Sequence, residues 1–166
     1  MNIKKILFVF STLLFATSIL FYDVLYSDSI FLTQDSISAK SIKHGIEKST
    51  LDFGEYPKWM PWIFGGLPST HSMQNISEYY YPHHIIKLIK IFSIPWFWNF
   101  LIHFLFAGLG MYLLLNHLKL NFLSSLFGSI AYTIMPWMIT MIVHGHGSQV
   151  MTAAYIPWIV WAIFKL

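Results

Sequence analysis

The residues with the clearest chemistry are two histidines in the short polar segment His144-Gly-His146-Gly-Ser-Gln149, which separates two apolar runs. Imidazole nitrogens ligate metal ions and hydrogen-bond phosphates. The intervening glycines give the backbone the freedom that an anion-binding turn needs. Two residues apart, the rings point the same way only where the chain is extended. A neutral histidine pair at a membrane edge is also ordinary polar surface, so both interpretations stay open.

Asp35 is a second chemical candidate, about a dozen residues beyond the first apolar run. It directly precedes residues 36–48, in which Ile37, Ile42 and Ile46 recur at helical spacing. An aspartate at that place can cap the helix by accepting hydrogen bonds from its first free N–H groups. A cap and a chemical role are both compatible with this position.

Two further histidines, His83 and His84, follow three consecutive tyrosines. Aromatic rings can stack on the face of a sugar, but a tyrosine belt at a membrane interface is the simpler account. His103 lies inside an apolar run, where a titratable side chain either has a function or is hydrogen-bonded to a neighbouring helix.

Residues 59–69, Trp-Met-Pro-Trp-Ile-Phe-Gly-Gly-Leu-Pro-Ser, combine two tryptophans, two prolines and a glycine pair. Pro61 and Pro68 each lack a backbone donor, whereas Gly65 and Gly66 permit positive φ. This pattern predicts that neither a helix nor a strand forms here. Because the segment is strongly apolar, we expect a re-entrant or interfacial loop held against a membrane domain.

Composition favours a membrane protein with several spans. Of the 166 residues, 56% are hydrophobic and only 10% are charged, whereas soluble domains are about a quarter charged. The net charge of +3 comes from scattered lysines without arginine, which argues against nucleic acid as a partner. The absence of cysteine excludes thiolate metal sites. No phosphate-binding loop, dinucleotide-binding, zinc-protease or nucleophile-elbow motif occurs.

Apolar runs predict four transmembrane helices, since about 20 apolar residues cross a bilayer. These runs cover residues 6–22, 94–115, 122–143 and 150–166. Pro95 should lie in the first turn of the second span, and Pro136 should kink the third. Residues 23–93 form a long loop, in which residues 36–48 and 85–92 are predicted to be amphipathic helices at the membrane interface.

The lysines predict the orientation of these spans. By the positive-inside rule, Lys4 and Lys5 hold the N-terminus in the cytoplasm, together with Lys119 and Lys165. Residues 23–93 and 144–149 then lie outside. We expect an all-α polytopic membrane bundle with about four transmembrane helices and a structured extracytoplasmic first loop. Residues 1–166 form a single membrane domain in this interpretation, as the N-terminal part of a longer protein.

Four features in this order resemble the YfhO-like bacterial membrane proteins, a family within the GT-C class of polytopic glycosyltransferases. They are the single N-terminal span, the acidic residue in Thr33-Gln34-Asp35, the loop from Pro57 to Pro68, and Gly145-His-Gly-Ser-Gln149 ahead of Tyr155-Ile-Pro-Trp158. The resemblance covers roughly residues 35–158. It implies further spans and a place in the bacterial cytoplasmic membrane.

The resemblance also implies an activity. Such an enzyme takes a sugar from a polyprenyl-phosphate-linked donor in the membrane and transfers it to a cell-envelope glycopolymer or lipid acceptor on the outer face. Asp35 would be the catalytic residue, as a base or as a metal ligand. The residues expected to bind substrate are Trp59, Gly65, Gly66, His83, His84, His144, His146 and Gln149.

No cofactor is evident, and a divalent metal is left open. The sequence has Gln34-Asp35 where a doubled acid would favour a metal, and a lone carboxylate is a poor cation ligand set. The alternative function is a non-enzymatic envelope protein, either a transporter or an assembly component whose outer loop binds lipid or a partner. Pro136 and Pro157, both inside predicted spans, favour that alternative.

Overall fold

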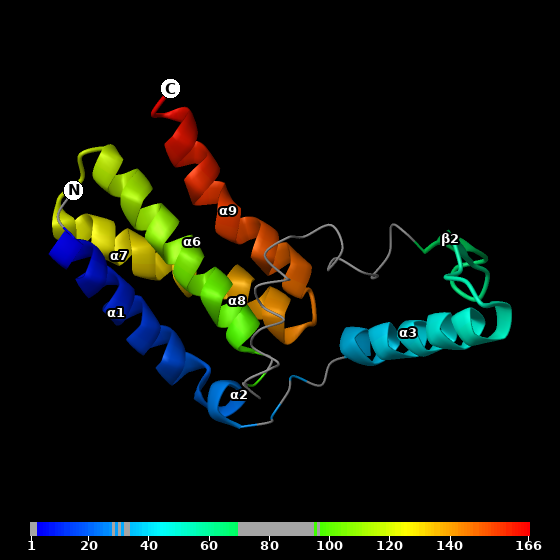
Figure 1. Ribbon diagram of the computed structural model, residues 1–166. Coiled ribbons are helices and arrows are strands. Elements are labelled where there is room, and N and C mark those ends of the chain that lie inside the picture. The colour runs from blue at the N-terminus through cyan, green and yellow to red at the C-terminus, as the bar shows by residue number, and fades with distance from the viewer. Residues whose placement is uncertain (1–2, 28, 30, 32–33, 70–94, 96) are drawn as a thin grey trace. The chain divides into compact units, whose positions relative to one another are not determined.

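The computed structural model describes residues 3–27, 29, 31, 34–69, 95 and 97–166 (Figure 1). This part of the chain is mostly helical. It divides into two compact units, a bundle unit within residues 1–31 and 93–166 and a loop unit within residues 32–92. Each unit is described by itself. The predicted helix at 85–92, His83 and His84 lie outside the described residues.

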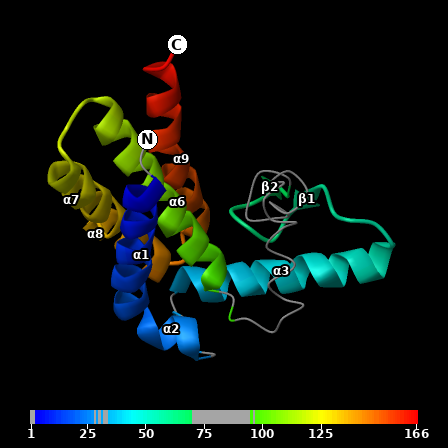
Figure 2. The same ribbon diagram turned by 60° about the vertical axis from the view of Figure 1, so that its left-hand side comes forward.

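The bundle unit is organised around helix α6. Its helices are α1 (Ile3–Leu20), α2 (Tyr22–Tyr26), α6 (Trp98–His117), α7 (Phe122–Thr133), α8 (Pro136–Val143) and α9 (Gly147–Ile163). Helix α6 packs against α9, α7 and α1, and it runs alongside them in both views (Figures 1 and 2).

The core of the bundle unit is apolar apart from the buried Asn99 and His103 and a few small hydroxyl groups at helix contacts. Leu13 of α1 and Phe104 of α6 are fully buried. The Ser129 hydroxyl of α7 donates a hydrogen bond of 2.8 Å to the Gly108 carbonyl of α6. A Cβ at Gly108 would overlap the Thr133 hydroxyl. Small residues therefore bring α6 and α7 into close contact, as in packed membrane helices.

Three helical segments in the described part of the chain are long and apolar enough to cross a membrane: Ile3–Leu20, Trp98–His117 and Phe122–Val143. They correspond to the first three predicted spans. Helix α6 begins at Trp98, so the prediction that Pro95 lies in its first turn is wrong. Pro95 instead precedes the helix and accepts a hydrogen bond of 3.1 Å from the Trp98 N–H.

The fourth predicted span corresponds to α9, which has 17 residues. At 1.5 Å per residue it rises about 26 Å, a little less than the hydrocarbon core of a bilayer. The fourth span stays a prediction. Pro157 lies inside this helix and is buried.

The kink predicted at Pro136 is confirmed as a break in the third segment. Helix α7 ends at Thr133, and α8 begins at Pro136, which is its first residue. Proline cannot donate to the carbonyl four residues earlier, and its ring clashes with that turn. The helix therefore stops before Pro136 and restarts with proline at the position where it is best tolerated.

The loop unit consists of helix α3 (Gln34–Phe53) followed by the strands β1 (Trp59–Met60) and β2 (Leu67–Pro68). The helix predicted over residues 36–48 is confirmed and is longer at both ends. The prediction that no strand forms within residues 59–69 is wrong, because β1 and β2 pair antiparallel with Trp59 opposite Pro68 and Met60 opposite Leu67.

The two strands are compatible with the prolines because the ladder is only two residues long. Pro61 follows β1, and Pro68 closes β2 in a two-stranded sheet, where a missing donor is tolerated. The Ser69 N–H continues the pairing by donating a hydrogen bond of 3.1 Å to the Lys58 carbonyl. The Ser69 hydroxyl donates a second hydrogen bond to the Pro57 carbonyl.

Candidate functional site

Aromatic contacts fix one end of the bundle unit, called here the aromatic end. Phe31 lies 5.9 Å from Phe97 and Phe97 lies 5.8 Å from Phe100, measured between ring centroids. The Phe100 ring in turn fills the space where a Cβ at Gly147 would stand. The point at which the chain leaves towards the loop unit therefore lies at the same end as the segment 144–149.

The opposite end carries the lysines and is called the basic end. Lys5 lies over the Phe122 ring at 5.5 Å, and Lys165 lies over the Trp161 ring at 4.2 Å. Nearby, the His117 Nε2 atom is 3.2 Å from the Phe164 carbonyl oxygen. Together with Lys4 and Lys119, these are all the lysines in the described residues of the bundle unit. Charge is thus unequal between the two ends.

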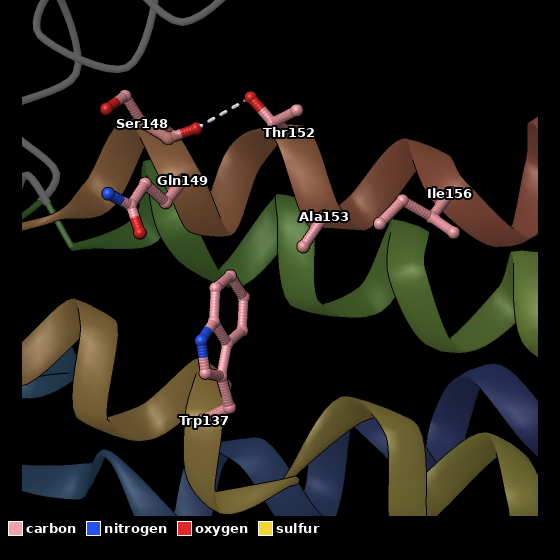
Figure 3. A pocket seen from close by; sticks show the side chains of 6 residues that line it. All are labelled: Trp137, Ser148, Gln149, Thr152, Ala153 and Ile156. Carbon is pink, nitrogen blue, oxygen red and sulfur yellow. Dashed lines mark hydrogen bonds between the residues drawn. The ribbon is translucent and has the colours of Figure 1, made fainter.

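An open groove of about 340 Å³ lies where α8 meets the first turns of α9, at the aromatic end (Figure 3). It is lined by Trp137, Ser148, Gln149, Thr152, Ala153 and Ile156. The Trp137 side chain rises from α8 towards α9, and the other five side chains come from α9.

The groove changes from polar to apolar along α9. The polar residues lie nearest the start of the helix: Ser148, Gln149 and Thr152. The Thr152 hydroxyl donates a hydrogen bond of 2.9 Å to the Ser148 carbonyl. Ile156 lies eight residues after Ser148, about 12 Å further along the helix axis. That distance is enough to pass from a headgroup layer into hydrocarbon.

The break before Pro136 explains how Trp137 reaches the groove. With α8 starting at Pro136, Trp137 occupies the second position of a new helix whose direction is independent of α7. Its side chain is 44% exposed. At Ala153, which lines the groove, the Tyr132 hydroxyl of α7 donates a hydrogen bond of 2.9 Å to the backbone carbonyl and links α7 to α9.

His144 and His146 lie just before the groove in the chain. The His144 Nδ1 atom is 2.8 Å from the Thr140 carbonyl, and the ring is exposed. His146 is half-buried and directly precedes α9. Gly145 between them has φ of 91°, which confirms the expected backbone freedom. The backbone here turns instead of extending, so the spacing does not align the two rings.

In the loop unit, Asp35 lies in the first turn of α3 and its side chain is exposed. The helix begins one residue earlier than the predicted cap, and an acidic side chain there is favoured by the helix dipole. Trp62 packs against α3 at Gly45, ten residues after Asp35. Ten residues of helix span about 15 Å, well beyond hydrogen-bond reach. Asp35 and the hairpin therefore do not meet at that contact.

The hairpin turn uses the glycine pair as predicted. The Gly66 N–H donates a hydrogen bond of 2.8 Å to the Ile63 carbonyl. The central residues Phe64 and Gly65 have φ of 49° and 76°, as in the mirror-image turns that favour hairpins. A phenylalanine in this left-handed region costs about 1–2 kcal/mol. Trp59 lies over Gly66, at a position where any Cβ would overlap its ring.

The structure therefore groups the predicted residues into two sets. Gln149 lines the groove, with His144 and His146 preceding it at the aromatic end of the bundle unit. The loop unit contains Asp35, Trp59, Gly65 and Gly66.

Sequence reasoning did not find the other five groove residues. Ser148, Thr152 and Ile156 are spaced four residues apart, so they lie on one face of a helix. That spacing was the signal in the sequence that could have grouped them.

Among the described residues, no cluster of three histidine or acidic side chains could hold a metal ion. Comparison with models of protein families, with curated proteins and with solved structures finds no match. The three apolar helical segments are consistent with a membrane protein.

Proposed function

We propose that this chain is a multi-span protein of the bacterial cytoplasmic membrane that binds a polyprenyl-phosphate-linked sugar at its aromatic end. It would transfer the sugar to a cell-envelope acceptor outside the cytoplasm. The observation that carries the proposal is the groove between α8 and α9, whose polar and apolar parts are ordered along the helix axis.

The orientation follows from the unequal charge of the two ends. Lysines near span ends favour the cytoplasm, so the basic end would face inwards with the N-terminus. The aromatic end, with the groove and the connection to the loop unit, would then face outwards. This is the face on which lipid-linked sugar donors are used in the GT-C enzymes that the sequence resembles.

The groove suits a lipid with a sugar headgroup. Trp137 offers an aromatic face on which the apolar side of a sugar ring can stack. The Gln149 amide and the hydroxyls of Ser148 and Thr152 can hydrogen-bond sugar hydroxyls or phosphate oxygens. Ala153 and Ile156 offer apolar surface for the first units of the lipid chain.

Asp35 supplies the base in this proposal. A general base must hold its carboxylate within hydrogen-bond reach of the acceptor hydroxyl. Asp35 follows Phe31 by four residues in the chain, and Phe31 packs at the aromatic end, so this proposal assigns Asp35 to the same side of the membrane. No cofactor is needed for this step, and a divalent metal stays open.

One observation favours a non-enzymatic transporter as the second candidate. The third apolar segment is broken between Thr133 and Pro136, and discontinuous helices often form substrate sites in transporters. Trp137, directly after the break, lines the groove. A transporter would bind the same lipid-linked sugar and release it on the other side without cleaving it.

The experiment uses the chain in nanodiscs with a polyprenyl-phosphate-linked hexose and measures binding and sugar transfer separately. Thr152→Trp fills the groove and should weaken binding at least about tenfold, equivalent to 1.4 kcal/mol. Ile159→Trp is the matched control, because Ile159 is an exposed residue of the same helix and does not line the groove. Equal binding by the two variants would overturn the groove assignment.

Asp35→Asn separates the two candidate functions. If Asp35 is the base, the variant binds the donor like the unchanged chain but loses transfer. Full transfer in Asp35→Asn would remove Asp35 from the mechanism. Binding without transfer in the unchanged chain, together with movement of the lipid across the membrane, would favour the transporter.

A further inference from the structure

The hairpin of the loop unit presents aromatic side chains to its surroundings. Phe64 at the turn is 96% exposed, and Trp59 and Trp62 are 53% and 47% exposed. These three residues are called the aromatic tip. Met60, between the two tryptophans in sequence, is fully buried. The hairpin thus has an inner side that packs and an outer side that is apolar.

The aromatic tip is held in a defined shape. Trp59 lies over Gly66, Trp62 lies against Gly45 of α3, and the turn is closed by the hydrogen bond from Gly66 to Ile63. A bulky residue rarely has positive φ, yet Phe64 is fixed in that conformation with nearly its whole side chain exposed. Such an arrangement is unfavourable in water and is favoured where the ring enters an apolar phase.

The connection between the loop unit and the bundle unit indicates that the membrane is the apolar phase available to the aromatic tip. The loop unit leaves the bundle unit near Phe31, which packs on Phe97 at the aromatic end. Gln34, the start of α3, is three residues later, so it lies within about 11 Å of Phe31. The start of α3 is therefore tethered near any membrane that holds α1 and α6, and this tether raises the effective concentration of lipid at the aromatic tip.

We propose that the aromatic tip inserts into the headgroup and upper acyl region of the membrane leaflet at the aromatic end of the bundle. Tryptophan is enriched at this depth in membrane proteins. Residues 59–69 carry no charged side chain, so insertion leaves no charge to be buried. Lys58, directly before β1, is exposed and could remain among the headgroups. The loop unit then has a third attachment to the membrane besides its two chain ends.

The chemistry favours lipid over a protein partner. Protein interfaces use charged groups around an aromatic centre to fix orientation. Residues 59–69 carry none, and the exposed Lys58 directly before them is a residue that a headgroup layer also accommodates. A bilayer surface requires apolar area and no fixed register.

The absence of cysteine in the natural sequence makes the test direct. A single cysteine replaces Phe64 in the full chain, is labelled with an environment-sensitive fluorophore, and is reconstituted in vesicles of phosphatidylcholine and phosphatidylglycerol. The control carries its cysteine at Glu47, an exposed residue of α3. We expect spin-labelled acyl chains to quench the label at position 64 severalfold more than the label at 47, and aqueous iodide to show the reverse order.

A second pair of variants moves the label from position 64 to position 58. A label at Lys58→Cys is compared with and without Phe64→Asp, which places a charge on the aromatic tip. Insertion predicts that iodide reaches the label at 58 more readily once Phe64 is replaced, while Leu51→Asp on α3 leaves it unchanged.

Two results would overturn the proposal. Equal iodide quenching at positions 64 and 47 would show an aromatic tip that stays in water. Protection at 64 from both iodide and spin-labelled lipid would show that protein covers it. Neither result bears on donor binding in the groove, so the two proposals fail independently.

Discussion

The bundle unit and the loop unit place their aromatic residues differently. In the bundle unit, Phe104 is fully buried, and its ring lies 5.2 Å from that of Phe21, which is itself buried. In the loop unit, Phe64 is 96% exposed and the two tryptophans beside it are about half exposed. The bundle unit buries some aromatic rings between its helices and exposes others, such as Phe15 and Phe127, whereas every described aromatic residue of the loop unit is exposed.

Gly108 and Gly65 also differ, although Gly66 of the loop unit is crowded by Trp59 as Gly108 is by its neighbours. Gly108 lets α7 approach α6 and leaves no room for a side chain. Gly65, at φ 76°, has open space around it and serves only to turn the backbone. The bundle unit should therefore be sensitive to added volume in its interior, and the loop unit should depend on a few packed side chains and on what its outer face contacts.

The largest effect should come from Gly108→Leu. The new side chain would collide with Thr133 on α7 and with Leu13 on α1. Overpacking between two helix contacts at once should cost about 3 kcal/mol or more of unfolding free energy, the upper end for this kind of change. Unfolding of the chain in detergent, followed by far-ultraviolet circular dichroism, measures the loss.

Ala131→Leu is the control for that measurement, since Ala131 lies on α7 with its side chain exposed. It should leave the unfolding free energy nearly unchanged. If Gly108→Leu were equally mild, the close approach of α6 and α7 would be wrong, and the contrast between the units would lose its main support.

A smaller and local effect is expected from Met60→Ala in the loop unit. Met60 is fully buried in β1, and removing most of a buried methionine side chain costs about 2 kcal/mol where one side of the site can relax. Hydrogen exchange should accelerate at the amides of β1 and β2 while those of α6 stay protected. Leu51→Ala, at a side chain that is 85% exposed, is the matched control.

Protection lost in both units together would contradict this expectation, because it would show that the two units unfold as one. The separation of the units by their internal contacts would then have no thermodynamic counterpart.

Tyr132→Phe should have a still smaller effect, because it removes a single hydroxyl. That hydroxyl donates a hydrogen bond of 2.9 Å to the carbonyl of Ala153, a residue of the groove, and joins α7 to α9. The loss of one such hydrogen bond is worth about 1 kcal/mol. Tyr26→Phe, at an exposed tyrosine of α2, should have no measurable effect. Equal stability of both variants would show that the link does not hold the groove.

Much of the bundle unit was predictable because its signals are local. Long apolar runs identify helices whatever their neighbours, and Pro136 breaks a helix by its own covalent geometry. The start of α6 was misplaced because Ile94 and Pro95 are apolar enough to extend the run. The hairpin was missed for a related reason, since prolines and glycines indicate a turn but do not reveal that residues seven and nine apart pair across it.

The candidate site was less predictable, because it depends on packing between helices. Gln149, predicted from its place in a polar segment, lines the groove, whereas Trp137 lies in an apolar run and has no sequence signal of a binding role. Trp137 lines the groove with Ser148 and Thr152 only because the helix restarts at Pro136. Asp35 was found from its position alone, and its chemical role stays a prediction.

The smallest effect should come from Lys43→Ala on α3. Lys43 and Glu47 lie one helical turn apart, with 3.6 Å between the Lys43 nitrogen and a Glu47 oxygen, and both side chains are more than half exposed. Such a pair contributes about 0.3 kcal/mol and is screened by salt. Hydrogen exchange of α3 should therefore change slightly at low ionic strength and not at all at high ionic strength. A large effect in high salt would mean that Lys43 contacts something beyond Glu47, and the outer surface of the loop unit would then depend on charge as well as on aromatic side chains.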